Sequence, residues 1–479
     1  MTTAALSRTT ESAALKPTLD SAIARRLDAV SSGRWLALTV PAPPVEPHAM
    51  LDAAEAIGLN VQDHGVLWRP PEGASFAAVG AAVSLDLRGD DRFGELRLRA
   101  AEAFSRLDTD ALDGAEATAP RAFGGFAFDV GAADAAPWHD FGDGCFTLPR
   151  WLYRRRDQGA DLTLTVGADE LAATPSSQWA ERMTLLLRQL AATAERDPGF
   201  FGARPMELSR LEVPRLLEDS EADAAWVRLV EDIRGAIHSG DVEKIVAARR
   251  FTVELGASRP VARVLERLEQ RRRATAFAFS RPGATFLGLT PERLITKKGM
   301  RFVTEALAGS IESGAEHAAE LLDSGKDRLE QQLVVDAILR RLEPLAERLE
   351  AADRPSVREL PEVLHLQTPI RGDLNAPRHV LELAELLHPT PAVGGVPTPS
   401  ALRWIREREN DARGWYASPV GWFDAAGDGE FFVALRSCLL LPGRAELYAG
   451  AGIVADSDPG LELDEVRLKL RTLLHALAA

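Results

Sequence analysis

The chain has 479 residues, 46% hydrophobic and 27% charged, which is ordinary for a globular protein and long enough for one large domain or two. Its net charge of −15 argues against a nucleic-acid binder, which needs clustered basic surface, but leaves room for a small anion held by local donors. Cys145 and Cys438 form neither a disulfide framework nor a zinc motif, and no apolar run is long enough for a membrane helix. We expect a cytoplasmic protein that binds neither nucleic acid nor membrane.

The first part of the chain predicts mixed strands and helices behind a flexible N-terminal tail at residues 1–20. RWLALTVPAP and DLTLTVGA have the β-rich alternation of strands, and SSQWAERMTLLLRQLAATAE has the apolar spacing of an amphipathic helix. RAFGGFAFDV is interpreted as a Gly124–Gly125 turn beside a strand that enters a packed core. We place this N-terminal α/β part at residues 21–217 and expect it to contribute to a common core.

A polar, acidic connector (GARPMELSRLEVPRLLEDSEAD) leads into the second part, residues 218–479. There a helix is expected to end at Gly240, followed by a strand (KIVAARRFTVEL) and a long helix over residues 326–349. The last third predicts strands in GWFDAAGDGEFFVALRSCLLL and AELYAGAGIV, then a closing helix, LDEVRLKLRTLLHAL. Because helices and strands lack a strict βαβ rhythm, the fold class is α+β.

Two of these helices carry carboxylates beside their apolar stripes. Glu330 lies one turn before the stripe of its helix, and Glu462, Glu465 and Lys469 form one row on the closing helix. The spacing also suits ordinary surface ion pairs, Lys326–Glu330 and Glu465–Lys469. The alternative is a magnesium site, because inward carboxylates are rare unless they are paired or bound to metal, and Mg²⁺ prefers oxygen ligands.

Other segments suggest an anion site. ALAGS (306–310) and YAGAGIV (448–454) combine glycines with accessible main-chain donors, although glycine more often marks a bulge or a turn. Arg436 falls within an apolar strand pattern, and a buried arginine needs either a structural ion pair or an anionic ligand such as a carboxylate.

Four further residues could be functional or merely structural. Lys244 opens a strand and is either an exposed lysine or one that burial makes into a base. Glu292, after Pro291, is either a turn residue or a general acid in apolar surroundings. His365 and His388 lack metal-ligand spacing and are interpreted as core histidines.

Ten segments together resemble the chorismate-utilising enzymes, a family that includes isochorismate, salicylate, anthranilate and aminodeoxychorismate synthases. They span residues 241–470 in the order of the family, and the N-terminal part is similar to that of menaquinone-type isochorismate synthases, notably in RAFGGFAFD. The matching segments are DVEKIVAARR, FLGLTPERL, TEALAGS, SGKDRLEQQLVV, LHLQTPIRGDL, LLHPTPAVGG, RGWYASPVGW, FFVALRS, LYAGAGIV and SDPGLELDEVRLKL.

The resemblance implies a fold and a site. The fold would be one large unit of two packed antiparallel-rich sheets, with helices outside and a deep active-site cleft. Glu330 and Glu465 would bind Mg²⁺, with Glu462 reaching it directly or through water, and the metal would bind the ring carboxylate of chorismate. The pocket would comprise Gly309 and Ser310 near that carboxylate, Arg436, Tyr416, Gly450 and Gly452 at the enolpyruvyl carboxylate, and His365, Thr368 and Lys469 in the wall.

Within the family, Lys244 favours water as the nucleophile, because members that use ammonia generally lack this lysine. We expect an isochorismate synthase in which Lys244 is the general base for water attacking C2 and Glu292 is the general acid for the departing C4 hydroxyl. Ser310 favours release of isochorismate, since salicylate synthases often have threonine there and go on to eliminate pyruvate. A salicylate synthase, an anthranilate or aminodeoxychorismate synthase-like enzyme, and a catalytically silent chorismate-binding protein are the alternatives. No amidotransferase subunit is expected, and the chain would be a monomer or a weak homodimer. Its product would serve menaquinone, siderophore or salicylate synthesis.

Overall fold

The computed structural model describes residues 18–196, 213–216, 219–256, 259–269, 274–314, 316–359 and 363–478. The predicted tail therefore lies mostly outside the described residues. Its last two residues belong to helix α1 (Leu19–Leu27), which is capped by the hydroxyl of Thr18 accepting the amide of Ser21.

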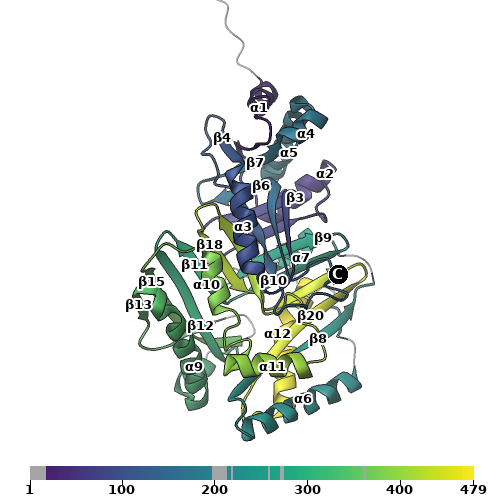
Figure 1. Ribbon diagram of the computed structural model, residues 1–479. Helices are drawn as coiled ribbons and strands as arrows, with labels where there is room; N and C mark the ends of the chain where they lie inside the picture. Colours follow the sequence, from purple (N-terminus) through teal and green to yellow (C-terminus); the bar gives the residue numbers. More distant parts are fainter. Residues whose placement is uncertain are drawn as a thin grey trace, which may run out of the picture.

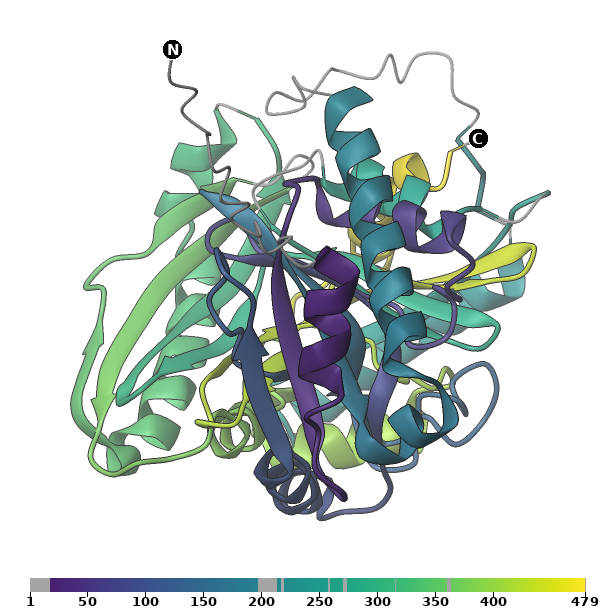
Figure 2. The ribbon, with the colours of Figure 1, turned by 90° about the horizontal axis from the view of Figure 1, so that it is seen from above.

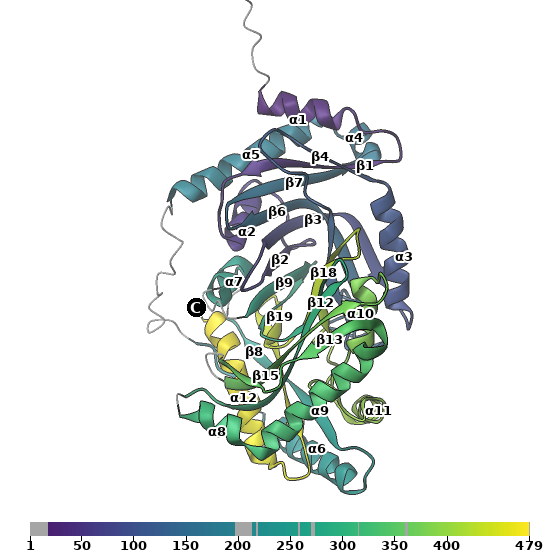
Figure 3. The same ribbon diagram turned by 90° about the vertical axis from the view of Figure 1, so that its left-hand side faces the viewer.

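The N-terminal part consists of a curved set of strands with helices on its outer face. The strands follow one another from β1 and β7 through β6, β3 and β2 to β9 (Figure 3), and α1 and α5 lie side by side over them (Figure 2). The predicted strands and helix are confirmed as β1, β7 and α5. The elements are β1 (Trp35–Ala42), α2 (Pro47–Ala56), β2 (Val66–Arg69), β3 (Ser75–Leu87), α3 (Arg92–Ser105), β4 (Leu107–Ala111), β5 (Arg121–Phe126), β6 (Gly144–Arg156), β7 (Gly159–Gly167), α4 (Ala168–Ala173) and α5 (Ser176–Arg196).

The C-terminal part places its helices around the far end of the sheet, below the N-terminal strands in Figure 1. The helix predicted to end at Gly240 is confirmed, because Gly240 has a φ of +82° just past the end of α6. The elements are α6 (Ser220–His238), β8 (Lys244–Glu254), α7 (Val261–Glu269), β9 (Thr275–Arg281), β10 (Ala284–Thr290), β11 (Arg293–Lys298), β12 (Arg301–Glu312), α8 (His317–Asp323), α9 (Gly325–Leu342), β13 (Ala346–Ala351), β14 (Ser356–Glu359), β15 (Val363–Leu374), α10 (Val380–Leu387), β16 (Gly395–Val396), α11 (Thr398–Arg408), β17 (Pro419–Asp424), β18 (Gly429–Val433), β19 (Ser437–Leu441), β20 (Arg444–Ile453) and α12 (Pro459–Ala476).

Strand pairing joins the two parts of the chain. Among the described strands only β1 and β4 pair in parallel, and all other pairings are antiparallel. β2 pairs with β9 and β5 with β17, so strands from the N-terminal part bond directly to strands of the C-terminal part. The α+β class is confirmed. The two expected layers are refined into one continuous hydrogen-bonded network of 20 strands.

Two predicted elements differ from the structure. Gly124 and Gly125 lie within β5 and not in a turn: a Cβ on Gly124 would lie 1.9 Å from the carbonyl oxygen of Cys145, so glycine serves close packing of the strands. The long helix ends at Leu342 and not at residue 349, and residues 346–351 form β13 instead. Pro344 explains this end, because proline lacks the amide that a continuing helix needs.

The interior is continuous across both parts. The apolar stripes predicted for the two carboxylate-bearing helices are buried, including Val334 and Ile338 on α9 and Val466 and Leu470 on α12. The helix α9 packs on β12, and α12 packs on β20. Across the described residues, the chain contains no helix of the length and apolarity needed to span a membrane.

Candidate active site

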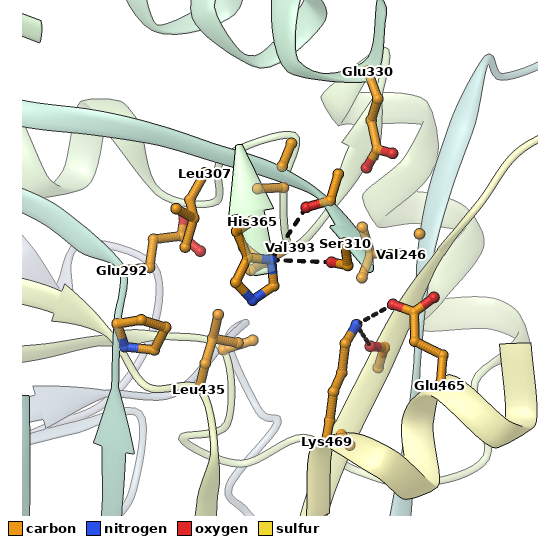
Figure 4. A pocket seen from close by; sticks show the side chains of 18 of the residues that line it. Val246, Glu292, Leu307, Ser310, Glu330, His365, Val393, Leu435, Glu465 and Lys469 are labelled. Carbon is orange, nitrogen blue, oxygen red and sulfur yellow. Dashed lines mark hydrogen bonds and ion pairs between the residues drawn. The ribbon is translucent and has the colours of Figure 1, made fainter. Parts of the chain in front are cut away.

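A single pocket brings together every predicted site residue except Thr368. It lies among β8, β12, β15 and β20, with α9 and α12 on one side. Figure 4 shows Glu292 and Leu307 on one side of His365, and Glu330, Glu465 and Lys469 on the other. The predicted residues that line the pocket are Lys244, Glu292, Gly309, Ser310, Glu330, His365, Tyr416, Arg436, Gly450, Gly452, Glu462, Glu465 and Lys469.

Lys244 enters the pocket from the first position of β8 and is almost fully buried, with 2% of its surface exposed. Its Nζ donates a hydrogen bond of 2.6 Å to Oε1 of Glu330 on α9. Glycine at position 452 makes room for this pair, because a Cβ there would lie 2.9 Å from Cε of Lys244 and 3.4 Å from Oε1 of Glu330. The exposed-lysine alternative is therefore wrong.

Three carboxylates line the side of the pocket formed by α9 and α12. Burial would raise the pKa of Glu330, but the adjacent Lys244 ammonium reverses this and leaves it below its ordinary value. Glu465 pairs with Lys469 at 2.6 Å, as the helix spacing predicted, whereas Glu330 pairs with Lys244 and not with Lys326. Burial raises the pKa of Glu462, and the neighbouring Glu465 adds to this.

Glu330, Glu462 and Glu465 carry the oxygen ligands that a hard divalent cation prefers, although their side chains are not gathered into one group of three. Glu462 is buried beside another carboxylate and lacks an ion pair among the described residues, which makes a compensating cation favourable there. Lysines neutralise the other two carboxylates. Within the described residues, acidic, histidine or cysteine side chains nowhere gather in a group of three ready to hold a metal.

Glu292 lies on the opposite side of the pocket in an environment that keeps it protonated. It follows β10, and its side chain is 3% exposed. Burial and, to a lesser extent, the nearby carboxylate of Glu305 raise its pKa to about 8, although Lys244 and the hydroxyl of Thr390 act to lower it. A carboxyl group that is neutral at physiological pH can donate a proton, which a turn glutamate exposed to solvent could not do.

His365 connects the two sides of the pocket through defined hydrogen bonds. Its Nε2 lies 3.3 Å from NH2 of Arg436, and since guanidinium can only donate, Nε2 accepts. Burial lowers the pKa of His365 well below 6.5, and Arg436 adds to this, so the ring is neutral and Nδ1 carries its hydrogen. Nδ1 therefore donates to the carbonyl of Gly309 at 3.2 Å and lies 3.0 Å from Oγ of Ser310, which leaves the Ser310 hydrogen free to donate elsewhere.

The backbone is strained where the pocket holds its buried arginine. Among the described residues, three that are not glycine have a positive φ, and two of them, Ala417 (+60°) and Arg436 (+47°), line the pocket. Arg436 lies between β18 and β19 and not inside a strand, so the predicted strand position is corrected. Such strain costs about 1–3 kcal/mol and persists where surrounding structure holds it in place. Here it turns the guanidinium toward His365.

Tyr416 belongs to an aromatic support that the sequence did not reveal. It stacks on Tyr448, with ring centroids 5.5 Å apart, and Tyr448 accepts a hydrogen bond of 2.9 Å from the indole of Trp138. Burial raises the pKa of Tyr416 to about 12, so its hydroxyl remains a donor. Trp138 comes from the N-terminal part of the chain, which therefore supports the pocket wall directly.

Thr368, predicted in the wall, lies behind it. Its hydroxyl accepts a hydrogen bond of 2.9 Å from Gln331, which ties α9 to β15. His388 also lies outside the pocket lining: its Nε2 contacts the carbonyl of Phe128, and burial lowers its pKa to about 3, as expected for a core histidine. The prediction missed several lining residues, among them Lys326, Asp327, Arg413 and Tyr448. All four lie inside the matched segments, and for Lys326 and Asp327 the signal was their closeness in sequence to Glu330.

Comparisons with known proteins identify the family of the chain. Residues 21–478 match the family described as chorismate binding enzyme. The chain belongs to this family. It is 38% identical to the salicylate biosynthesis isochorismate synthase of Pseudomonas aeruginosa over 431 residues, which cover 86% of this chain and 84% of that protein. It is 33% identical to the isochorismate synthase MenF of Bacillus subtilis over 368 residues, 75% of each protein.

Solved structures of the family share the fold. The menaquinone-specific isochorismate synthase MenF of Escherichia coli superimposes with a TM-score of 0.70 at 24% identity, covering 95% of this chain and all of that one. Anthranilate synthase component I of Streptococcus pneumoniae gives a TM-score of 0.63 at 20% identity, covering 84% and 92%. The fold alone therefore does not separate a member that uses water from one that uses ammonia.

Proposed function

We propose that this chorismate-binding enzyme is a magnesium-dependent isochorismate synthase. The observation that carries the proposal is that Lys244, at the start of β8, and Glu292, between β10 and β11, are both buried and line one pocket. Both of the similar proteins named above by sequence are isochorismate synthases. An enzyme that adds water at one carbon and expels hydroxide from another needs a base and an acid, each worth about 10²–10⁴-fold in rate.

Lys244 would accept a proton from water as the water attacks C2 of chorismate. In the structure its Nζ donates a hydrogen bond to Glu330, which holds the side chain at the pocket wall. Glu292 would donate its proton to the departing C4 hydroxyl while the double bonds shift between the two carbons. The pKa of about 8 supports this role, since the carboxyl is still protonated at neutral pH.

Chorismate carries two carboxylates, and the pocket offers two kinds of anion partner. Arg436 is held at the wall beside His365, with the Tyr416 hydroxyl nearby, and would bind the enolpyruvyl carboxylate. Glu330, Glu465 and Glu462 would hold Mg²⁺ on the α9 and α12 side. A bound Mg²⁺ would neutralise the ring carboxylate and orient it.

Ser310 supports release of isochorismate over elimination of pyruvate. Its hydroxyl hydrogen is free for substrate because His365 supplies the hydrogen in their shared contact. The neutral His365 ring is held by Arg436, Gly309 and Ser310 and is not placed as a free base. We further propose that no amidotransferase subunit is needed and that the chain acts in the cytoplasm as a monomer or weak homodimer.

Incubation of the purified chain with chorismate and Mg²⁺, followed by chromatography, tests the proposal. Isochorismate as the product is expected, and activity should disappear with a chelator and return with Mg²⁺. Salicylate and pyruvate would instead assign a salicylate synthase. Turnover only with ammonium salts would assign an anthranilate-type enzyme, and no turnover under any condition would indicate a silent chorismate-binding protein.

A further inference from the structure

The pocket has to keep an acid protonated beside several cations. Lys244, Lys469 and Arg436 all line it, and a positive charge near a carboxyl group favours loss of its proton. Glu292 would thus become an unusable carboxylate unless something opposes this field. Burial is one opposing influence. A second is a carboxylate that lies behind the pocket wall and does not line the pocket.

We propose that Glu305, which does not line the pocket, is a positioning residue whose fixed negative charge keeps Glu292 in its acid form. This inference rests on the function proposed above, in which Glu292 donates a proton. Glu305 would not touch the substrate. It would act through Glu292 and thereby set the upper end of the pH range in which the enzyme works.

Glu305 is held firmly next to Glu292. It lies on β12, two residues before Leu307, which lines the pocket on the same side of His365 as Glu292 (Figure 4). Its Oε1 accepts a hydrogen bond of 2.9 Å from the backbone amide of Arg293, the residue that follows Glu292. The carboxylate is therefore tied to the backbone one residue from the proposed acid.

Both carboxylate oxygens of Glu305 face hydrogen-bond donors or a cation. Its Oε2 accepts a hydrogen bond from Nε2 of Gln367 and lies 3.5 Å from NH1 of Arg358. Donors thus face both oxygens, as a carboxylate requires. The residue is 8% exposed, so solvent screens its charge only weakly.

The groups that face Glu292 come from several elements. Lys244 from β8 and the hydroxyl of Thr390 lower its pKa, while burial and Glu305 raise it to about 8. Tyr416 lies close enough that the charge of Glu292 helps to raise the pKa of its hydroxyl. Glu305 is the group among these that supplies a fixed negative charge, and it does so from outside the volume that substrate fills.

The pH profile of Glu305→Gln tests this role, because the substitution keeps the shape of the side chain and removes its charge. Activity requires Glu292 protonated, so kcat/KM falls as pH rises through its pKa. Without the Glu305 charge that pKa drops, and the basic limb of the profile should move to lower pH by about one pH unit. On the alkaline side this amounts to about a tenfold lower rate. Glu305→Asp keeps the charge and should hold the limb close to that of the wild-type enzyme.

Glu446→Gln is the matched control. Glu446 is also buried, on β20, and contacts Thr252 and Arg444 without contributing to the pKa of Glu292. Its basic limb should coincide with the wild-type limb. An unmoved limb in folded Glu305→Gln enzyme would overturn the proposal, as would an equal displacement in the control.

An infrared measurement separates this inference from the proposed function. A protonated carboxyl group gives an infrared carbonyl band, and the band that is missing in Glu292→Gln belongs to Glu292. The loss of this band with rising pH can be followed without substrate. In Glu305→Gln this loss should occur at lower pH, whereas in Glu305→Asp, which keeps the charge, it should occur close to the wild-type pH. If the wild-type enzyme forms no isochorismate but the band is lost at lower pH in Glu305→Gln, the proposed function is wrong and the effect of Glu305 is supported. If the wild-type enzyme forms isochorismate but the band is lost at the same pH in Glu305→Gln, the proposed function stands and the proposed role of Glu305 is wrong.

Discussion

Replacing Glu292 by glutamine should make the protein more stable while it disables catalysis. The carboxyl group has an ordinary pKa of 4.5 in the unfolded chain and about 8 in the folded chain, mainly because of burial. Since the folded pKa is the higher one, the native state holds the proton between these pH values and the unfolded state does not. The stability of the wild-type chain therefore falls as pH rises from 4.5 to 8.

The size of this effect follows from the two pKa values. At about 1.4 kcal/mol for each pH unit, the loss between pH 4.5 and pH 8 amounts to about 5 kcal/mol. Glutamine has a similar shape and no proton to lose, so the variant avoids this cost. Its advantage in free energy of unfolding should be near zero at pH 4.5 and should grow to several kcal/mol at pH 8.

Urea unfolding of both proteins at pH 5, 6.5 and 8 measures this difference, and kcat for isochorismate formation should fall by about 10²–10⁴-fold in the variant. Glu446→Gln again serves as a control. That carboxylate contacts Arg444, so its loss should reduce stability. A Glu292→Gln variant that is less stable than wild type at pH 8, or a difference that stays constant with pH, would refute the reasoning.

Three further substitutions test other parts of the pocket. Lys244→Ala should lower kcat by about 10²–10⁴-fold and leave the Kd for chorismate, measured by calorimetry, nearly unchanged; an active variant would remove Lys244 as the base. Arg436→Lys should raise KM for chorismate at least about tenfold, because lysine lacks the planar fork that matches a carboxylate. Its circular dichroism spectrum should stay unchanged, and an unchanged KM would contradict the role of Arg436. Gly452→Ala should reduce kcat with little change in Tm, because the added Cβ meets the flexible end of Lys244. In Gly450→Ala the added Cβ would lie 2.5 Å from the backbone carbonyl oxygen of Ala247, so this variant should lower Tm by several degrees. Equal Tm losses in the two glycine variants would contradict this distinction.

Sequence reasoning located most of the pocket because its residues lie in compact segments. Glu330 and Glu465 each sit beside an apolar stripe, and a helical period places such a carboxylate on the inward side without knowledge of the fold. Gly452 and Lys244 belong to segments whose order along the chain matches the family. The α+β class also follows from the irregular succession of helices and strands.

The parts that sequence reasoning missed depend on contacts between distant segments. Nothing near Trp138 indicates that its indole bonds to Tyr448, 310 residues later. The ion pair between Lys244 and Glu330 could not be distinguished from a helical pair with Lys326, because only the folded chain brings β8 to α9. Pro344 is a local signal for the end of its helix, but the apolar period that continues beyond it favours a longer helix.

The pairing of β2 with β9 and of β5 with β17 has a consequence for truncated forms of the enzyme. A product that began at residue 219 would keep every predicted catalytic residue, yet two of its strands would present unpaired edges, one of them rich in phenylalanine and alanine. Exposed apolar edges of this kind recruit strands from other molecules. Such a fragment would form aggregates, and selection would therefore act against internal translation starts and for retention of both parts in one polypeptide.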